Sequence, residues 1–441
     1  MNKKNIPTVS SWEFLMNSYK IIKNPLPFHL KKFKTLGENF KVKAISVEAL
    51  FSRDVDLADY VLKKNQKNYT KTKVQTENLS QYVGKGLLTS EGEHWRKQRK
   101  LIQPAFHKKQ LIHLLESIED AIISEFKNIE EEKLTNIFPI LNDLAFNTVV
   151  QSLFSNAANP KQIKRLQWIT ENIQKRFIKE LRQPYLAWWF HLSGSKDRQL
   201  NLSEESRDIL RHIADERRAS KKSYGDLLDM LLESKYDDGS SMDEEQLIDE
   251  LLIIFIAGHE TTSNVLTFTF QLLAKHPEWQ EVIYQEFQQN KMKSNDLMGE
   301  IMASKNCQQV IEEAMRLFPP AYIIDRVNLE PDKFKDMDIP LDSNILIHVY
   351  AIHRHPDLWD NPNDFHPERF DEGGQKFSSQ YFPFGAGPRK CIGNNFAMFE
   401  MILAVNHLVK TYKLYPEFDE IAVNPLITLK PKNGFLRFEK R

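Results

Sequence analysis

The chain has 441 residues, of which 41% are hydrophobic and 27% charged, a composition typical of a soluble globular protein with a large core. Lysine and arginine together number 60, as do aspartate and glutamate, so no global charge favours nucleic acid or an anionic membrane as a partner. The two cysteines, Cys307 and Cys391, are too few for a disulfide framework or a four-cysteine zinc site, and they favour a reducing compartment.

The first 38 residues are predicted to be an N-terminal lead-in without a membrane anchor. They hold no apolar run long enough to span a bilayer and no signal-peptide apolar region with a small-residue cleavage site. The longest apolar run of the chain, "LLIIFIA" from Leu251 to Ala257, is followed by His259 and Glu260 and therefore predicts a buried helix. We expect a cytoplasmic protein.

The predicted elements change from strands to helices along the chain. Alternating residues predict short strands over 39–53, and "DVDLADYVLKK" predicts a helix behind an aspartate cap. The pattern is helical from Gly92 to about Ala274. One long helix is expected to start at Ser241 as N-cap, with Glu244 completing a capping box, and to end near Pro277. Its length of roughly 50 Å is enough to cross a whole domain.

After Phe318 the sequence predicts turns and short strands, and "NNFAMFEMILAVNHLVK" predicts one more helix. The chain has no Pro/Gly-rich linker and no internal repeat, so we expect a single domain over residues 1–441.

The stretch "FPFGAGPRKCIG", residues 382–393, is predicted to be a shaped loop. Its glycines and its proline disfavour a regular helix or central strand. Cys391 then lies at the N-terminus of the next helix, where partial positive charge favours a thiolate. A lone cysteine is more often a small buried apolar residue, so the surrounding pattern decides.

That pattern resembles the cytochrome P-450 family of haem-thiolate monooxygenases. Five residues fit F-x-x-G-x-R-x-C-x-G at every fixed position: Phe384, Gly387, Arg389, Cys391 and Gly393. The resemblance covers about residue 40 to the end. It implies a mainly α fold with a small β-rich region, in which haem is sandwiched between the long central helix and the cysteine loop.

By this resemblance Cys391 is the axial thiolate ligand of the iron of haem b. Gly393 lets the backbone pass close under the porphyrin, and Phe384 can shield the sulfur from water. Arg389 would meet a haem propionate. "HWRKQRK" places Trp95 and Arg99 four residues apart on one helix face, and Arg326 stands in "IIDRV"; the family uses these positions for the propionates, although a basic run is generally a solvated surface.

The pair Glu313 and Arg316 in "EEAMR" is by itself an ordinary (i, i+3) salt bridge. The family locks such a pair to an arginine of a later segment, which here is Arg369 in "HPERF". The resemblance therefore implies a structural lock of these three residues.

"AGHETT" places small and polar residues at the apolar centre of the long helix, which indicates either close helix packing or a site. By resemblance, Glu260 and Thr261 are the catalytic acid–alcohol pair that handles protons for bound oxygen. Ala257 and Gly258 would make room for the cofactor, and His259 would point away into packing or solvent.

The resemblance implies a monooxygenase that uses O2 and two electrons to oxidise a C–H bond of a small organic substrate. Hydroxylation, for example of a fatty acid, and oxidative O-demethylation of a polar methyl ether such as a methoxylated sugar both remain open. Alternatives are a peroxide-driven haem peroxygenase and a non-enzymatic haem sensor. We expect a soluble bacterial type, a monomer without a fused reductase, served by a separate ferredoxin or flavodoxin with an NAD(P)H-dependent reductase, and no nucleic-acid or membrane partner.

Overall fold

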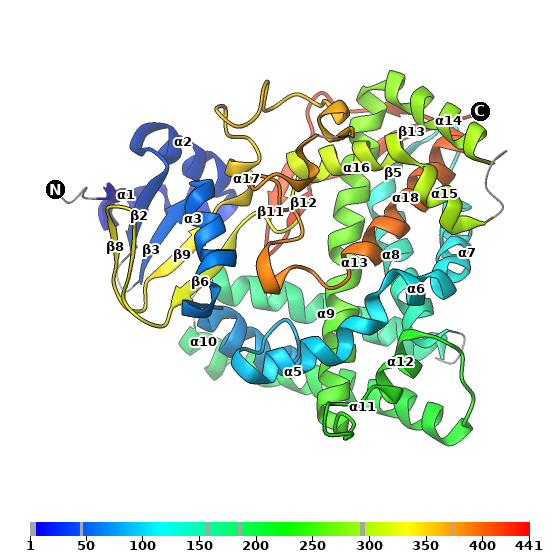
Figure 1. Ribbon diagram of the computed structural model, residues 1–441, viewed down its shortest axis with the longest axis horizontal. Helices are drawn as coiled ribbons and strands as arrows, with labels where there is room; N and C mark the ends of the chain where they lie inside the picture. The colour runs from blue at the N-terminus through cyan, green and yellow to red at the C-terminus, as the bar shows by residue number, and fades with distance from the viewer. Residues whose placement is uncertain (1–5, 45–46, 156–158, 184–186, 292–295, 373) are drawn as a thin grey trace. The chain divides into compact units, whose positions relative to one another are not determined.

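The computed structural model describes the chain except residues 1–5, 45–46, 156–158, 184–186, 292–295 and 373 (Figure 1). Two compact units share the chain. Unit 1 comprises Met1–Thr72, Gln309–Cys391 and Ala422–Lys432; unit 2 comprises Lys73–Gln308, Ile392–Ile421 and Asn433–Arg441. The backbone thus passes repeatedly between them without a linker, and the single domain expected from the sequence stays a prediction.

A six-stranded mixed sheet forms the framework of unit 1. Its strands, in spatial order, are β1 (Thr8–Val9), β2 (Asn39–Ala44), β3 (Val47–Ser52), β9 (Asn344–Ile347), β6 (Ile324–Asn328) and β4 (Tyr69–Thr70). The pairs β1–β2 and β3–β9 are parallel, and the others are antiparallel. Ile345 and Ile347 of β9 pack with Val61 and Phe382 in the core, which ties the start of the cysteine loop to the sheet.

Short helices and hairpins complete unit 1. They are α1 (Ser11–Lys23), α2 (Leu26–Leu36), α3 (Val55–Asp59) with a π-turn over Tyr60–Lys64, α17 (Val349–Ile352), and the hairpins β7 (Asp332–Phe334)–β8 (Met337–Ile339) and β11 (Val423–Pro425)–β12 (Leu429–Pro431). Asp54 caps α3 by accepting the backbone N–H groups of Asp56 and Leu57. The strands predicted over 39–53 and the aspartate-capped helix after them are confirmed.

Unit 2 is built mainly of helices, as the pattern after Gly92 predicted (Figure 1). They are α4 (Ser80–Val83), α5 (Gly92–Ile102), α6 (Lys108–Leu111), α7 (Leu115–Phe126), α8 (Ile137–Phe154), α9 (Pro160–Arg182), α10 (Ala187–Leu192), α11 (Ser195–Ser220), α12 (Leu227–Glu233), α13 (Glu244–Lys275), α14 (Pro277–Lys291), α15 (Leu297–Ala303) and α18 (Asn394–Thr411). A small antiparallel sheet of β10 (Tyr412–Pro416), β13 (Phe435–Lys440) and β5 (Leu134–Asn136) accompanies them. Helix α16 (Lys305–Leu317) runs from unit 2 into unit 1.

The long helix α13 has 32 residues, but its predicted cap is wrong. Asp243, not Ser241, is the N-cap and accepts the backbone N–H of Gln246. Glu244 is therefore the first helical residue and cannot close a capping box with Ser241. The helix ends at Lys275, and Pro277 begins α14.

Two helices of unit 2, α8 and α13, are long and apolar enough to cross a membrane by length and composition alone. In the structure, 61% and 72% of their apolar windows are buried. We therefore interpret both as core helices of unit 2.

Candidate active site

The cysteine loop of unit 1 is shaped by its glycines. Gly385 and Gly387 have φ angles of +73° and +66°, which L side chains rarely adopt. A side chain at Gly387 would also collide with the backbone carbonyl of Leu62. The Cys391 N–H donates to the Phe384 carbonyl at 2.9 Å and closes the loop. The glycine conformations, the close contact with Leu62 and this hydrogen bond together define the conformation of the loop.

The two cysteines differ in exposure. Cys391 is exposed, whereas Cys307 is completely buried in unit 2, with its sulfur 3.8 Å from the carbonyl of Ile402. Burial, with smaller contributions from the charges of Glu286 and Glu300, raises the pKa of the Cys307 thiol. Among the two, Cys391 is the thiol that can ligate an external metal.

Gly393 provides a test of whether these residues fit haem. It is the N-cap of α18 and has a φ of −86°, which any residue can adopt. The nearest atom to a Cβ at this position would be Cε1 of Phe106 at 3.9 Å, an ordinary contact. Neither the backbone nor the neighbours in unit 2 require glycine here, whereas a planar group lying against the backbone would. Together with the exposed thiol two residues earlier, the position fits haem.

The predicted lock comes together within unit 1. Glu313 and Arg316 are both fully buried on α16 and form a bidentate pair, Nε to Oε2 at 2.7 Å and Nη2 to Oε1 at 2.8 Å. Arg369 approaches with its Nε 3.5 Å from Oε1 of Glu313, and the backbone N–H of His366 donates to the same oxygen at 2.9 Å. This is a buried carboxylate between two arginines rather than a solvated surface pair.

The remaining partners of Arg316 were not identified from the sequence. Its Nη1 donates to the backbone carbonyls of His353 and Pro362 at 2.7 and 2.8 Å, and its Nη2 to that of Asp364 at 3.1 Å. The guanidinium lies 5.0 Å from the ring centroid of Trp359. Backbone carbonyls carry no residue-type signal, so only the tryptophan in "DLWDNP" could have pointed to this arrangement.

The four proposed propionate ligands divide equally between the units. In unit 1, Arg326 of β6 is buried and donates from Nη1 to the carbonyl of Asp325 at 2.7 Å, and Arg389 is half-buried in the loop. In unit 2, Trp95 and Arg99 lie on one face of α5, the first buried and the second half-buried. Each unit thus presents part of the predicted set.

The centre of α13 carries an open stripe along one face. Ala257 is exposed, and Ile254 and Thr261 are half-buried, at positions i, i+3 and i+7 of one helix face. The Thr261 hydroxyl donates to the Ala257 carbonyl at 3.0 Å, and Glu260 beside it is buried. This face can meet a cofactor or substrate.

Gly258 serves packing instead of the open stripe. A Cβ at this position would lie 2.7 Å from Cγ2 of Val149 on α8, so the glycine permits close approach of two helices. The expectation that Gly258 makes room for the cofactor is corrected to the packing alternative. His259 is buried between Phe146 and Phe255, with Nδ1 3.1 Å from the Phe255 carbonyl, which places it in packing.

Two adjacent carboxylates of α13 hold the loop after α4, a feature that was not predicted from the sequence. Asp249 accepts the backbone N–H of Lys85 at 2.6 Å, and Glu250 accepts that of Leu87 at 3.0 Å. Burial raises the pKa of Glu250 to about 7. Glycines on either side of Lys85 in "GKG" permit this close approach and were the available signal.

Polar contacts also occur beside Arg326. Asp325 accepts a hydrogen bond from the Thr72 hydroxyl, and Tyr322 donates its hydroxyl to the Leu426 carbonyl at 2.9 Å. On α10, Trp188 and Trp189 are exposed.

The described residues include no cluster of His, Cys, Asp or Glu that could hold a metal ion.

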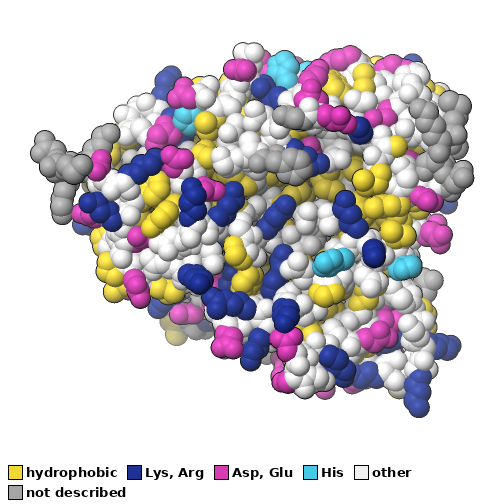
Figure 2. Space-filling model, in the orientation of Figure 1, with side chains coloured by type: hydrophobic (Ala, Val, Ile, Leu, Met, Phe, Trp, Pro, Cys, Tyr) yellow, Lys and Arg dark blue, Asp and Glu magenta, His cyan; other side chains and the backbone are white. Residues whose placement is uncertain are grey.

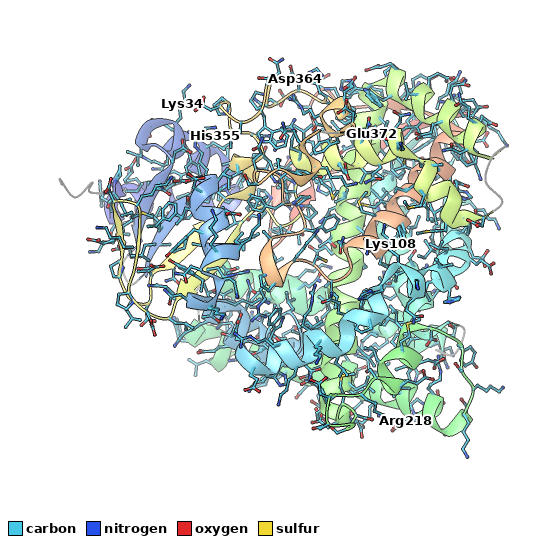
Figure 3. The ribbon with its side chains drawn as sticks, in the orientation of Figure 1. Lys34, Lys108, Arg218, His355, Asp364 and Glu372 are labelled. Carbon is cyan, nitrogen blue, oxygen red and sulfur yellow. The ribbon has the colours of Figure 1, made fainter. Side chains whose placement is uncertain are left out.

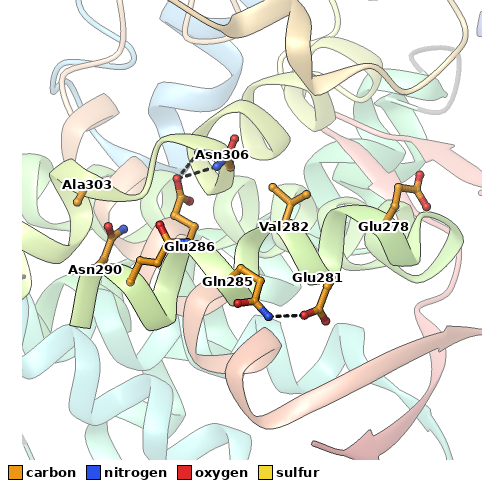
Figure 4. A pocket seen from close by; sticks show the side chains of 9 residues that line it. Glu278, Glu281, Val282, Gln285, Glu286, Asn290, Ala303 and Asn306 are labelled. Carbon is orange, nitrogen blue, oxygen red and sulfur yellow. Dashed lines mark hydrogen bonds between the residues drawn. The ribbon is translucent and has the colours of Figure 1, made fainter. Parts of the chain in front are cut away.

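A separate cavity of about 710 Å³ lies on unit 2 along α14 (Figure 4). Most of its lining is carboxylate and amide: Glu278, Glu281, Gln285, Glu286, Gln289, Asn290 and Asn306, with Val282 and Ala303. Glu286 accepts the backbone N–H groups of Asn306 and Cys307 and so caps α16. This lining does not suit haem and has no thiol.

Comparison with known proteins identifies the family. The cytochrome P450 family model matches residues 6–438. The chain is 28% identical to cytochrome P450 4d2 of Drosophila melanogaster, covering 93% of this chain and 87% of that protein. It is 29% identical to cytokinin hydroxylase of Arabidopsis thaliana (94% and 83% covered) and 30% identical to 11-oxo-beta-amyrin 30-oxidase of Medicago truncatula (82% and 73% covered).

A solved structure, that of the cytochrome P450DA heme domain, superposes with a TM-score of 0.88 at 21% identity, covering 99% of this chain and 97% of that one. The fold is thus the mainly helical P450 fold with small sheets that the motif implied. Because the relatives include insect and plant proteins, the soluble bacterial type stays a prediction. The chain belongs to the cytochrome P450 family and is a monooxygenase that carries haem with a cysteine thiolate ligand.

Proposed function

We propose that Cys391 is the axial ligand of the haem iron. The observation that carries this proposal is an exposed thiol on a conformationally fixed loop, two residues before the cap of α18. When bound, the haem activates O2 for insertion into a substrate C–H bond. Phe384, half-buried in the loop, limits water at the sulfur, and Gly393 leaves space for the porphyrin.

The propionates of the haem are assigned to four side chains, Trp95, Arg99, Arg326 and Arg389. Three guanidinium groups and one indole N–H are donors suited to two carboxylates. Arg326 supports this assignment because its guanidinium is a permanent cation with several N–H donors.

We assign proton handling to Glu260 and Thr261. The Thr261 hydroxyl lies on the open stripe of α13 and donates to a backbone carbonyl, so its oxygen can accept a further hydrogen bond from a proton donor. Glu260 is the adjacent ionisable group that can resupply the proton. Ala257, one turn earlier, keeps this face free of a large side chain.

Two substrate classes are proposed, a fatty acid that is hydroxylated and a polar methyl ether that is oxidatively demethylated. Apolar residues of the α13 stripe, such as Ile254, support the first. The carboxylate of Asp325, hydrogen-bonded to Thr72, supports the second because it can accept from a sugar hydroxyl. Titration with fatty acids and with methoxylated sugars, followed by the Soret shift, separates the two classes.

We propose that electrons come from a separate ferredoxin or flavodoxin, which is reduced by an NAD(P)H-dependent reductase. We also propose that the protein is a monomer in the cytoplasm. Exposed Arg96, Lys97 and Lys100 on α5 support an acidic donor. Peroxygenase and sensor activities are separated by one measurement. Only a monooxygenase consumes O2 and NAD(P)H with the donor in a substrate-dependent way.

The two cysteines test the ligand assignment. Cys391→Ser should lose the red-shifted Soret band of the reduced carbon monoxide complex, whereas Cys307→Ser should keep it. Loss of the band in Cys307→Ser, with Cys391→Ser unaffected, would show that the assignment is wrong.

A further inference from the structure

Helix α1 presents an apolar face that the protein leaves uncovered. The stripe consists of Trp12, Leu15, Met16, Tyr19 and Ile22, whose spacing places them on one side of the helix. These side chains are between 36% and 78% exposed, and no residue of α1 is buried. Single exposed apolar residues are normal in proteins, but five on one helix face form a continuous patch.

The opposite face of α1 fixes the helix to unit 1. Phe14 packs against the core cluster that contains Phe33 and Phe40, and Glu13 pairs with Lys32 of α2. Ser10 caps the helix by accepting the N–H of Glu13. The stripe therefore points outward because the helix is held by its other side, and this is not a frayed terminus.

The charges around the stripe are strongly one-sided. Residues 6–37 hold five lysines and a single acidic residue, although the whole chain is neutral. Lys20, Lys23, Lys31 and Lys34 are exposed, and within the described residues none of them forms an ion pair. Figure 3 shows Lys34 extending away from the ribbon of α2. Figure 2 shows acidic as well as basic side chains on the face that it draws.

We propose that α1, with the lysines of α1 and α2, binds the surface of an anionic lipid bilayer. Aromatic and aliphatic side chains of an amphipathic helix enter the boundary between headgroups and acyl chains, and lysines attract anionic headgroups. Trp12 and Tyr19 suit that boundary because each has an apolar ring and a polar atom. A second copy of the chain fits less well, since it would bring two lysine-rich surfaces together. The inference departs from the expectation of no membrane partner.

The test is sedimentation of the holoenzyme with vesicles. The protein should bind vesicles of equal parts phosphatidylglycerol and phosphatidylcholine much better than pure phosphatidylcholine, and binding should weaken as salt rises from about 0.01 to about 0.1 M. Trp12→Ser with Met16→Ser should lower the partition coefficient at least about tenfold. Lys20→Gln with Lys23→Gln should lower it about 20- to 30-fold.

Trp168→Ser is the matched control, because Trp168 is 48% exposed but lies on α9 in unit 2. It should bind vesicles as the wild type does, and every variant should keep the haem spectrum. Equal binding to both kinds of vesicle, or no binding at low salt, would overturn the proposal. So would a concentration-dependent dimer that Trp12→Ser with Met16→Ser abolishes, because a second copy would then cover the stripe.

Discussion

Two buried glutamates, one in each unit, have opposite surroundings. Glu313 of unit 1 accepts two hydrogen bonds from Arg316 and one from a backbone N–H, with a second arginine at 3.5 Å. Glu250 of unit 2 is equally buried, but within the described residues its hydrogen-bond donors are the Leu87 N–H and the side-chain amide of Gln246. Cations surround the first carboxylate, and only neutral amides bind the second.

The different surroundings give the two glutamates different roles. Glu313 fixes the framework around α16, whereas Glu250 on α13 can take up or release a proton. A carboxylate held by arginines is costly to disturb, so the lock of unit 1 fixes the chain around α16. A buried carboxylate without a cation binds a proton more readily, and the pKa of Glu250 is raised to about 7. Glu250 is thus a carboxyl group of α13 whose protonation can change near neutral pH.

Breaking the lock should have the largest effect. Glu313→Ala leaves Arg316 buried without its carboxylate, and loss of one partner from a buried ion pair costs about 3–5 kcal/mol. We expect little folded holoprotein, measured as the yield of the carbon monoxide complex and the urea midpoint. Glu312→Gln is the matched control on the same helix, because Glu312 pairs with the more exposed Lys376. Equal loss in both variants would contradict a special role for Glu313.

On α13, Thr261→Ala should affect catalysis rather than folding. Removal of one positioned proton-transfer group costs about 10²–10⁴-fold in the catalysed step. We expect unchanged haem content and substrate-binding spectrum, with reducing equivalents diverted to peroxide. Thr262→Ala is the control, since that hydroxyl donates to the Gly258 carbonyl and its side chain is buried. Unchanged coupling of NAD(P)H oxidation to product in Thr261→Ala would contradict the assignment.

The sequence predicted the elements and the motif residues much better than their surroundings. Periodicity located α13, and glycine positions located the cysteine loop, because these signals are local. The cap of α13 was misplaced because Ser241 and Asp243 are both good caps two residues apart. The carbonyls around Arg316 could not be predicted, since they depend on the path of the backbone. The contact of the α13 carboxylates with loop 84–90 could not be predicted either, because Leu87 and Glu250 are 163 residues apart in the sequence.

Glu250 should make stability depend on pH. Its pKa rises from 4.5 in the unfolded chain to about 7 in the folded one, so between these values the folded state binds more protons. The free energy of unfolding therefore falls as pH rises through this range, by on the order of 3 kcal/mol at about 1.4 kcal/mol per pKa unit. Glu250→Gln should flatten the decline in urea midpoints, whereas Glu278→Gln, on the surface of α14, should not. If the urea midpoint of Glu250→Gln fell as steeply with rising pH as that of the wild type, the pH dependence would belong to other groups.

The smallest effect is expected at the surface of α5, where the charges are only partly paired. Lys100 lies 2.7 Å from Asp237, and Lys97 lies 3.8 Å from Glu93, so the positive surface is weaker than the sequence alone suggests. An acidic electron donor should still dock there, and the positive charges should mainly raise its association rate.

Arg96→Glu with Lys97→Glu should slow the first electron transfer several-fold at about 0.01 M salt and less at about 0.1 M, because the Debye length falls from about 30 to about 10 Å. Lys221→Glu with Lys222→Glu changes the net charge equally at the end of α11 and should leave the rate close to that of the wild type. Stopped-flow reduction under carbon monoxide measures this step, and equal slowing by both double variants would show that net charge, not docking on α5, sets the rate.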